Sequence, residues 1–428
     1  MSITIEKLWE QKGFSPNESQ REAVLHIDSP LFLTAGPGSG KTRVLLWRTL
    51  NLIVFHGIKP DEIFLSTFTE KAAHQLKEGL LSLLGFVTNI TGRPYDISKM
   101  SVGTVHSLCQ KLLIDRRFSQ GVRQNSPVVM DELSQYFYIY NTKFWNELCK
   151  IGGLENNQES CEILNNYFGA IQGKGSRHVA VTNCISFFNR LSEEIIDPKI
   201  TNINSDDNQL KALLKMYEYY LDSLKKDGKF QRVDFSLLQQ SAYSFFKDSL
   251  VSNKVFKHVI IDEYQDTNSI QEKIFFELAK GTKNICVVGD DDQALYRFRG
   301  ATVENLVEFE SRCQKYFGIK AKRIDLDINY RSRKEIVNTY TKFIELENWE
   351  KESSTNTLAN NKHYRFMDKK IKAHSSDVLP SVATTELKKT EEVFGDIARF
   401  VKSLKEEGKV QDYNQISFLF PAMKKNSK

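Results

Sequence analysis

The feature that most constrains this chain is the glycine-rich turn Ala35-Gly36-Pro37-Gly38-Ser39-Gly40-Lys41-Thr42. An apolar run at residues 31–34 precedes it, and a helix-like stretch from 42 to 54 follows it. Glycines between a strand and a helix let backbone N–H groups wrap phosphates at the positive end of the helix. Ala35 stands where the strict pattern has glycine, but alanine is small. The turn therefore predicts a phosphate-binding P-loop within an α/β fold.

Two residues at the end of the turn are expected to carry its chemistry. Lys41 would reach the β- and γ-phosphates of ATP, and the Thr42 hydroxyl would ligate Mg²⁺. A glycine-rich turn before a helix can also form without any nucleotide. The Gly-Lys-Thr ending between a strand and a helix favours the nucleotide site.

A second, acidic site is expected at the end of another strand. The apolar run Val-Ile-Ile at 259–261 is followed directly by Asp262 and Glu263. Asp262 would hold Mg²⁺, directly or through water, and Glu263 would orient and deprotonate the attacking water. Two carboxylates after an apolar run can also simply cap a strand. The P-loop upstream makes catalysis the favoured interpretation.

Strand and helix patterns alternate along the rest of the chain, which predicts a doubly wound parallel sheet. Further strands are expected at 63–66, 259–261 and 285–288, with a helix at 70–84 after the first of them. Residues 109–230 have helical spacings without confident strands, so a mostly helical insertion is expected there.

A third block is expected from residue 321 onward. Its clearest element is an amphipathic helix with four apolar residues on one face, Phe394, Ile397, Val401 and Leu404. A short apolar strand at 416–420 is expected to follow the helix. The strand would belong to an incomplete sheet with an exposed edge.

Composition excludes a membrane protein and leaves the partner open. No apolar run approaches the roughly 20 residues that a membrane-spanning helix needs. The net charge of +5 permits an anionic partner but does not require one. Cysteines are scattered without metal-binding spacing, so a cytoplasmic protein with reduced, mostly buried thiols is expected. They are Cys109, Cys149, Cys161, Cys184, Cys286 and Cys313.

Two longer runs resemble motifs of the UvrD/Rep-type superfamily 1 DNA helicases. One is Asp262-Glu263-Tyr264-Gln265-Asp266-Thr267-Asn268, and the other runs from Val288-Gly289-Asp290-Asp291-Asp292-Gln293 to Ala301. The resemblance covers the chain almost end to end but is faint in the helical insertion. It implies a RecA-like ATP-binding domain from 1–108 and 231–320, an inserted helical subdomain at 109–230, and a partial second RecA-like domain at 321–428.

The resemblance also assigns further residues to the ATP site. Asn17 and Gln20 resemble an adenine-reading motif, and a glutamine amide can pair with both donor and acceptor edges of adenine. Arg43 matches a nucleotide-contacting arginine, and Gln293 a residue that senses the γ-phosphate and links it to the DNA site. In Asn329-Tyr330-Arg331-Ser332, Tyr330 would stack on adenine and Arg331 would act as an arginine finger.

A track for single-stranded DNA is implied by the same resemblance. Thr67-Phe68-Thr69-Glu70 and Gly103-Thr104-Val105-His106-Ser107 resemble its first two motifs. Glu70 replaces an asparagine that is common in the family, and Val105 a phenylalanine. Stacking on bases is tolerant of sequence. The candidate DNA-binding residues are Phe68, His106, Tyr296, Phe298 and Arg299. Arg297 and Arg299 would either contact phosphates or guard the Phe298 pocket.

The resemblance implies a helicase or translocase in which ATP hydrolysis, stimulated by nucleic acid, drives 3′-to-5′ movement on single-stranded DNA or DNA junctions. Two later motifs of the family do not appear after Arg331. A fragment, a natural truncation and one subunit of a split motor remain open, with a complementing C-terminal half or a nuclease as partner. The alternative is an ATP-gated DNA- or partner-binding subunit that does not unwind.

Overall fold

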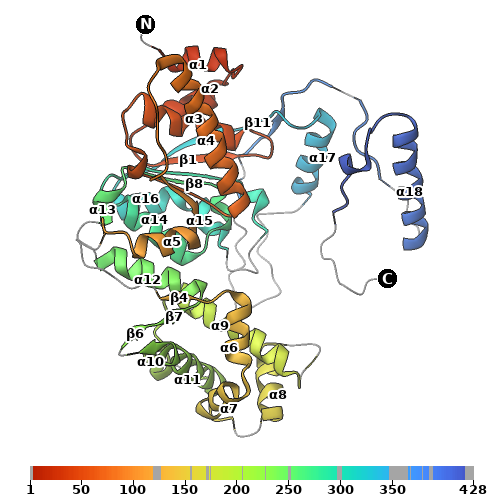
Figure 1. Cartoon of the computed structure of the whole chain (residues 1–428). Coiled ribbons are helices and arrows are strands. Elements are labelled where there is room, and N and C mark those ends of the chain that lie inside the picture. The colour runs from red at the N-terminus through yellow and green to blue at the C-terminus, as the bar shows by residue number, and fades with distance from the viewer. Residues whose placement is uncertain are drawn as a thin grey trace.

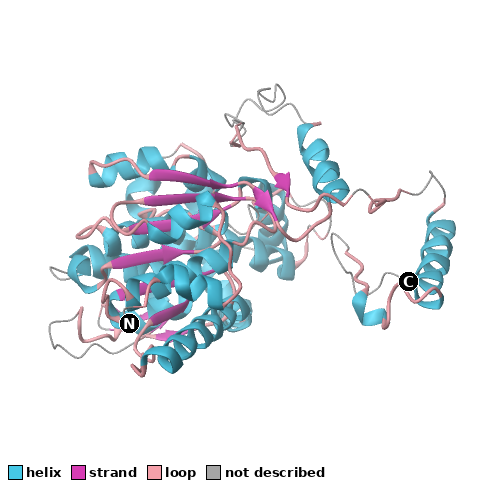
Figure 2. Cartoon of the chain, turned by 90° about the horizontal axis from the view of Figure 1, so that it is seen from above, coloured by secondary structure: helices cyan, strands magenta, loops and turns pink. Residues whose placement is uncertain are grey.

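The computed structural model describes residues 3–118, 127–154, 157–169, 173, 175–204, 206–226, 228–248, 252–295, 301–346, 365–366, 368–377, 379–384 and 389–419. Its centre is a six-stranded parallel sheet with the order β10–β1–β9–β8–β2–β3. The strands are β1 (Leu31–Ala35), β2 (Ile63–Thr67), β3 (Ser101–Thr104), β8 (His258–Ile261), β9 (Ile285–Gly289) and β10 (Lys322–Leu326). Their carboxyl ends share one edge of the sheet, where ligands bind in folds of this type. Figure 2 shows the arrowheads pointing toward the C-terminal helices.

Helices cover both faces of the sheet, so the central strands are buried on both sides (Figure 1). Alternate residues serve opposite faces: Phe32 and Phe64 join one hydrophobic core, and Leu33 and Leu65 the other. On the second of these faces lie α1 (Ile5–Gln11), α2 (Glu18–Leu25), α3 (Lys41–Val54) and α4 (Glu70–Thr91). On the first lie α5 (Val105–Leu113), α12 (Phe235–Asp248), α13 (Ser252–Val255), α14 (Ser269–Ala279), α15 (Val303–Val307) and α16 (Phe309–Phe317).

Side-chain caps fix the start of the two helices that follow β2 and β3. Thr69 caps α4 by accepting a hydrogen bond from the N–H of Ala72 at 3.1 Å. Thr104 caps α5 in the same way through the N–H of Ser107. Both caps lie at the carboxyl edge of the sheet. They fix where α4 and α5 begin, and so they fix the positions of the residues in the two turns.

The helical insertion forms a lobe below the sheet in Figure 1. Its helices are α6 (Glu132–Tyr140), α7 (Thr142–Ile151), α8 (Asn157–Tyr167), α9 (Arg177–Glu193), α10 (Pro198–Asn204) and α11 (Asn208–Ser223). The chain enters and leaves the lobe side by side, where β4 (Val128–Val129) pairs with β7 (Arg232–Val233). A second small ladder joins β5 (Lys225–Lys226) to β6 (Lys229–Phe230). The insertion is mostly helical, as expected.

The C-terminal block packs loosely and carries little of the core. It contains α17 (Lys334–Glu345), α18 (Thr390–Glu406) and a ladder between β11 (Ile328–Asn329) and β12 (Lys372–Ala373). The amphipathic helix expected around Phe394 is present as α18. No residue from 391 to 406 is buried.

Two features of this block differ from expectation. Residues 416–419 form no strand, and Leu419 is 93% exposed. A short strand needs a neighbour to pair with its backbone, and the described residues supply none there. Residues 322–326, expected in the third block, form β10 and pair with β1, because Ile324 and Leu326 complete the core under that edge. We therefore propose that the first unit extends to Leu326.

Two expectations from composition can be compared with the structure. All six cysteines are free and buried, as expected. None of the helices in the described ranges combines the length and apolar character needed to cross a membrane.

Candidate ATP site and DNA track

The P-loop follows β1 and leads directly into α3. Gly38 (φ +69) and Gly40 (φ +82) adopt the left-handed backbone conformation that favours glycine. Gly36 is constrained differently, because a Cβ there would collide with the side chain of Ile371 from the C-terminal block. Gly40 is the N-cap of α3, so Lys41 starts at the positive end of that helix.

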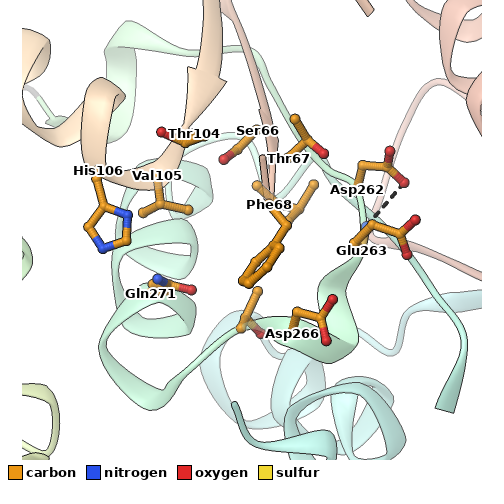
Figure 3. A pocket seen from close by; sticks show the side chains of 12 residues that line it. Ser66, Thr67, Phe68, Thr104, Val105, His106, Asp262, Glu263, Asp266 and Gln271 are labelled. Carbon is orange, nitrogen blue, oxygen red and sulfur yellow. Dashed lines mark hydrogen bonds between the residues drawn. The ribbon is translucent and has the colours of Figure 1, made fainter. Parts of the chain in front are cut away.

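The lysine of the P-loop meets the acidic pair that follows β8. Lys41 Nζ lies 3.2 Å from Glu263 Oε2. The backbone N–H of Glu263 donates to Oδ1 of Asp262 at 3.0 Å (Figure 3). Glu263 itself adopts φ +52 and ψ 47, a left-handed conformation that is uncommon outside glycine and concentrates at functional sites. The structure thus places three of the predicted catalytic residues together.

Burial controls the ionisation of the carboxylates around this pair. It raises the pKa of Asp262 to about 7, with Glu263 adding to the rise and Lys41 opposing it. The pKa of Asp266 also rises to about 7, again through burial first and Glu263 second. A divalent cation bound beside Asp262 would lower its pKa, because it stabilises the ionised form.

The chemistry of the site fits Mg²⁺. Asp262 offers a buried carboxylate, and Thr42 offers an exposed hydroxyl at the start of α3. Hard oxygen ligands of this kind are the ones that Mg²⁺ prefers. The Ser39 Oγ in the P-loop is buried without a hydrogen-bond partner among the described residues, so it has capacity for a further contact.

A chain of side-chain contacts leads from this site to the turn after β9. Gln265 donates to Glu263 Oε2 at 2.8 Å, and its Oε1 accepts the N–H of Asp290 at 3.1 Å. Gln293 in turn donates to Asp290 Oδ2 at 2.6 Å. The predicted γ-phosphate sensor is therefore connected to Glu263 through two buried residues, Gln265 and Asp290.

The residues expected to bind adenine lie next to the P-loop and contact one another. Asn17 and Gln20 form a capping box at the start of α2. Gln20 Nε2 donates to the carbonyl of Ser39 at 3.0 Å, and Asn17 Nδ2 donates to the Tyr330 hydroxyl at 3.0 Å. The ring of Tyr330 is half exposed and lies 4.8 Å from the ring of His374. Each atom of the Gln20 amide keeps capacity for one further hydrogen bond.

Two predicted arginines lie next to the loop without entering it. Arg43 packs its guanidinium over Phe14, 4.5 Å from the ring centroid, and donates to the carbonyl of Gly13. Arg331 is exposed, but its Cβ lies against Gly38, where an added side chain would collide with it.

Asn329 holds the Arg331 turn on the P-loop. Its Nδ2 donates to the carbonyl of Pro37 at 2.7 Å. Its Oδ1 accepts the N–H groups of Arg331 and Ser332 at 2.9 and 2.8 Å. The N–H of Tyr330 donates to the carbonyl of Gly38 at 2.9 Å. The C-terminal block therefore contacts the P-loop through the Asn329 side chain and the backbone N–H of Tyr330.

A pocket at the ends of β2, β3 and β8 contains two of the predicted DNA-binding residues (Figure 3). Phe68 projects into it beside Asp266, and its side chain is partly exposed. His106 lines the same pocket with its Nε2 2.6 Å from Nε2 of Gln239, and it packs edge-on against Phe235. Burial lowers the pKa of His106, which favours the neutral ring.

The remaining members of the expected track divide into two groups. Glu70 accepts a hydrogen bond from the Thr104 hydroxyl at 2.7 Å, so its carboxylate links the two runs that are predicted to bind DNA. The other four residues, Tyr296, Arg297, Phe298 and Arg299, lie outside the described residues.

Comparison with known proteins identifies the family. The family model for the UvrD/REP helicase N-terminal domain matches residues 16–314. The chain belongs to the UvrD/Rep helicase family.

Three relatives show how much of each protein the match covers. The chain is 32% identical over 348 residues to the ATP-dependent DNA helicase SRS2 of Saccharomyces cerevisiae, covering 78% of this chain and 27% of that protein.

Two bacterial UvrD/Rep relatives also match most of this chain and less than half of their own length. The ATP-dependent DNA helicase UvrD1 of Mycobacterium tuberculosis is 30% identical over 341 residues, which is 75% of this chain and 38% of that protein. The ATP-dependent DNA helicase PcrA of Staphylococcus epidermidis is 29% identical over 333 residues, which is 77% of this chain and 40% of that protein. The chain thus spans well under half the length of these relatives.

The sequence patterns do not indicate several residues that contact this UvrD/Rep-type site. Gln265 and Asp290 lie inside the two motif-like runs, but their contacts depend on the pairing of β8 with β9. Lys369, Ile371 and His374 come from a segment with no recognised motif. Their only sequence signal is a basic, alternating stretch, which does not indicate a nucleotide site.

Proposed function

We propose that this chain is the ATP-binding part of a DNA motor that hydrolyses ATP in response to single-stranded DNA and moves in the 3′-to-5′ direction. The observation that carries the proposal is the Lys41–Glu263 ion pair beside the buried carboxylate of Asp262. Named relatives support a DNA substrate, since each is an ATP-dependent DNA helicase.

In this proposal each residue has one task. Lys41 binds the β- and γ-phosphates, and Thr42 and Asp262 hold Mg²⁺. The ion, when bound, neutralises charge on the phosphate oxygens. Glu263 accepts a proton from the water whose oxygen attacks the γ-phosphorus, while the bond from that phosphorus to the ADP oxygen breaks. Gln265 holds the Glu263 carboxylate in place.

The remaining assignments concern binding. Tyr330 stacks on the adenine, and Arg331 stabilises charge on the γ-phosphate when the C-terminal block closes. Phe68 provides a stacking surface for a base of the DNA strand. The pocket it enters also contains Asp266 and adjoins Asp262 and Glu263, so a strand bound there would lie next to the hydrolysis site.

The proposal is tested by measuring ATP hydrolysis with and without single-stranded DNA. Lys41→Ala should abolish turnover, because the phosphates lose their cation. The matched control Lys77→Ala, on the exposed side of α4, should leave turnover unchanged. DNA-stimulated turnover that Lys41→Ala removes would support the motor. If the chain shows neither turnover nor Mg²⁺-dependent ATP binding that Lys41→Ala abolishes, the proposal fails.

A second candidate is an ATP-gated module that binds DNA or a partner polypeptide without unwinding. The C-terminal helices favour it, because Phe343, Leu346, Phe394 and Phe400 are each more than half exposed. ATP binding without turnover in the same assay would support this candidate. Unwinding that appears only when the C-terminal half of a relative is supplied would show that the motor needs a complementing partner.

A further inference from the structure

A buried lysine from the C-terminal block occupies the centre of the acidic turn after β9. The Nζ atom of Lys369 lies 2.7 Å from a carboxylate oxygen of Asp290, 2.6 Å from one of Asp291 and 2.7 Å from one of Asp292. The Lys369 side chain is only 4% exposed. Arg365 adds a second cation through Asp292 at 2.7 Å.

These contacts are not those of a solvated surface lysine. Burial alone lowers the pKa of Lys369, but Asp290 and Asp291 outweigh it and raise the pKa, so the ammonium stays charged. A buried charge persists only when it is paired and hydrogen-bonded. The three carboxylates lie close enough to hold a metal ion, but the ammonium already takes one oxygen from each. The turn is therefore built around a lysine.

The lysine is connected to the ATP site through a single carboxylate. Asp290 accepts from Lys369 on Oδ1 and from Gln293 Nε2 on Oδ2, at 2.7 and 2.6 Å. With one oxygen held by the ammonium, the other has a fixed direction, and so does the amide that it binds. The N–H of Asp290 also donates to Gln265, which contacts Glu263.

We propose that Lys369 is a positioning residue for the ATP site, which fixes the Gln293 amide toward the γ-phosphate by holding Asp290. The inference rests on the proposed function, because it requires Gln293 to face a bound triphosphate. It adds a dependence on the C-terminal block, since Lys369 follows β10 in the chain and lies just before β12. Sensing of the γ-phosphate then requires this segment to be docked on the sheet.

The test compares the affinity of the full chain for Mg²⁺ with the β,γ-imido analogue of ATP and for Mg²⁺ with ADP. Lys369→Met should lower the affinity for the ATP analogue relative to that for ADP by about tenfold. The reason is that the Gln293 amide would no longer be aligned to donate a hydrogen bond to the γ-phosphate. Lys370→Met removes the same charge from the exposed neighbouring residue and should leave the ratio unchanged.

Two double variants separate positioning from general effects. In a chain that already carries Gln293→Ala, Lys369→Met should change the ratio no further, since no amide remains to be positioned. Lys369→Met combined with Asp291→Asn restores the net charge of the turn. If Lys369→Met acted only by leaving excess negative charge that repels the triphosphate, this double variant would recover the wild-type ratio. A positioning role predicts that the ratio stays low.

Each outcome bears on one of the two claims. If the wild-type chain prefers the ATP analogue and Lys369→Met keeps that preference, the positioning role is wrong and the proposed function stands. Additive effects of Lys369→Met and Gln293→Ala, or recovery by Asp291→Asn, would also overturn the positioning role. If the wild-type chain binds neither nucleotide, the proposed function fails and this inference fails with it. A melting curve for each variant establishes that the chain is folded.

Discussion

At Asn329, one buried side chain joins the C-terminal block to the P-loop. It donates to the carbonyl of Pro37 and to the Tyr340 hydroxyl, and it accepts from the N–H groups of Arg331 and Ser332. Its amide is the only side-chain type of this size that both donates and accepts in this way. The position of the Arg331 turn therefore depends on an amide at residue 329.

Replacing Asn329 should destabilise this junction in a graded way. Asn329→Ala takes a hydrogen-bond partner from the Pro37 carbonyl and from the N–H groups of Arg331 and Ser332, and it should cost about 1–3 kcal/mol of unfolding free energy. Asn329→Asp keeps the acceptor for two N–H groups but loses the donor to Pro37, so an intermediate loss is expected. Thermal unfolding measures both, with Asn166→Ala on the exposed side of α8 as control. Equal stability of the alanine and aspartate variants would contradict the graded effect.

Among the elements, α18 shows how far an amphipathic pattern can be from a packed helix. Its sequence places Phe394, Ile397 and Val401 on one face, yet no residue from 391 to 406 is buried. Most of the stability of a helix in a protein comes from packing of its apolar face. The helix α3, by contrast, is enclosed between the sheet and its neighbours, with Val44 and Leu45 fully buried.

This difference should appear in amide hydrogen exchange. The amides of α18 should exchange at least about a hundredfold faster than those of α3, because local opening exposes them without disturbing a core. Exchange followed by mass spectrometry gives the comparison, and the two helices have similar lengths. Equal protection of α3 and α18 would show that α18 is packed in solution.

At the scale of the whole molecule, the helical lobe and the sheet share one hydrophobic core. The same cluster contains Phe32 of β1 and Tyr217 of α11. The joint between them also has a partly buried acid. Glu193, at the end of α9, accepts a hydrogen bond from the Ser236 hydroxyl at the start of α12 at 3.0 Å. Burial raises the pKa of Glu193 to about 7.

That shift predicts a pH dependence of stability. A carboxyl whose pKa is higher in the folded chain than in the unfolded chain stabilises the fold fully below the unfolded value, here 4.5. The contribution is lost progressively as the pH rises to about 7, and it amounts to about 3 kcal/mol. Glu193→Gln should remove this pH-dependent loss of stability. The stability of the variant relative to the wild type should therefore rise between pH 4.5 and 7.5. Melting temperatures across this range test it, with the exposed Glu132→Gln as control.

Much of the fold could be predicted from local patterns. The apolar runs that became β1, β2, β8 and β9 are buried on both faces, so they appear in the sequence as continuous apolar segments. β10 was missed as part of this sheet because it lies at the edge, where charged residues such as Lys322 and Asp325 interrupt the pattern. The strand expected at 416–420 failed for the opposite reason: it has the pattern but no described strand to pair with.

The sequence by itself determined the P-loop and the acidic pair, because their chemistry depends on residues that are adjacent in the chain. Only the tertiary structure decided that Lys41 meets Glu263, that His374 lies beside Tyr330, and that Lys369 lies within the Asp290 turn. Lys369 and Asp290 are separated by 79 positions, and neither carries a local signal of the other. A charge can be buried only where the fold brings its partners together, so such contacts are properties of the folded chain.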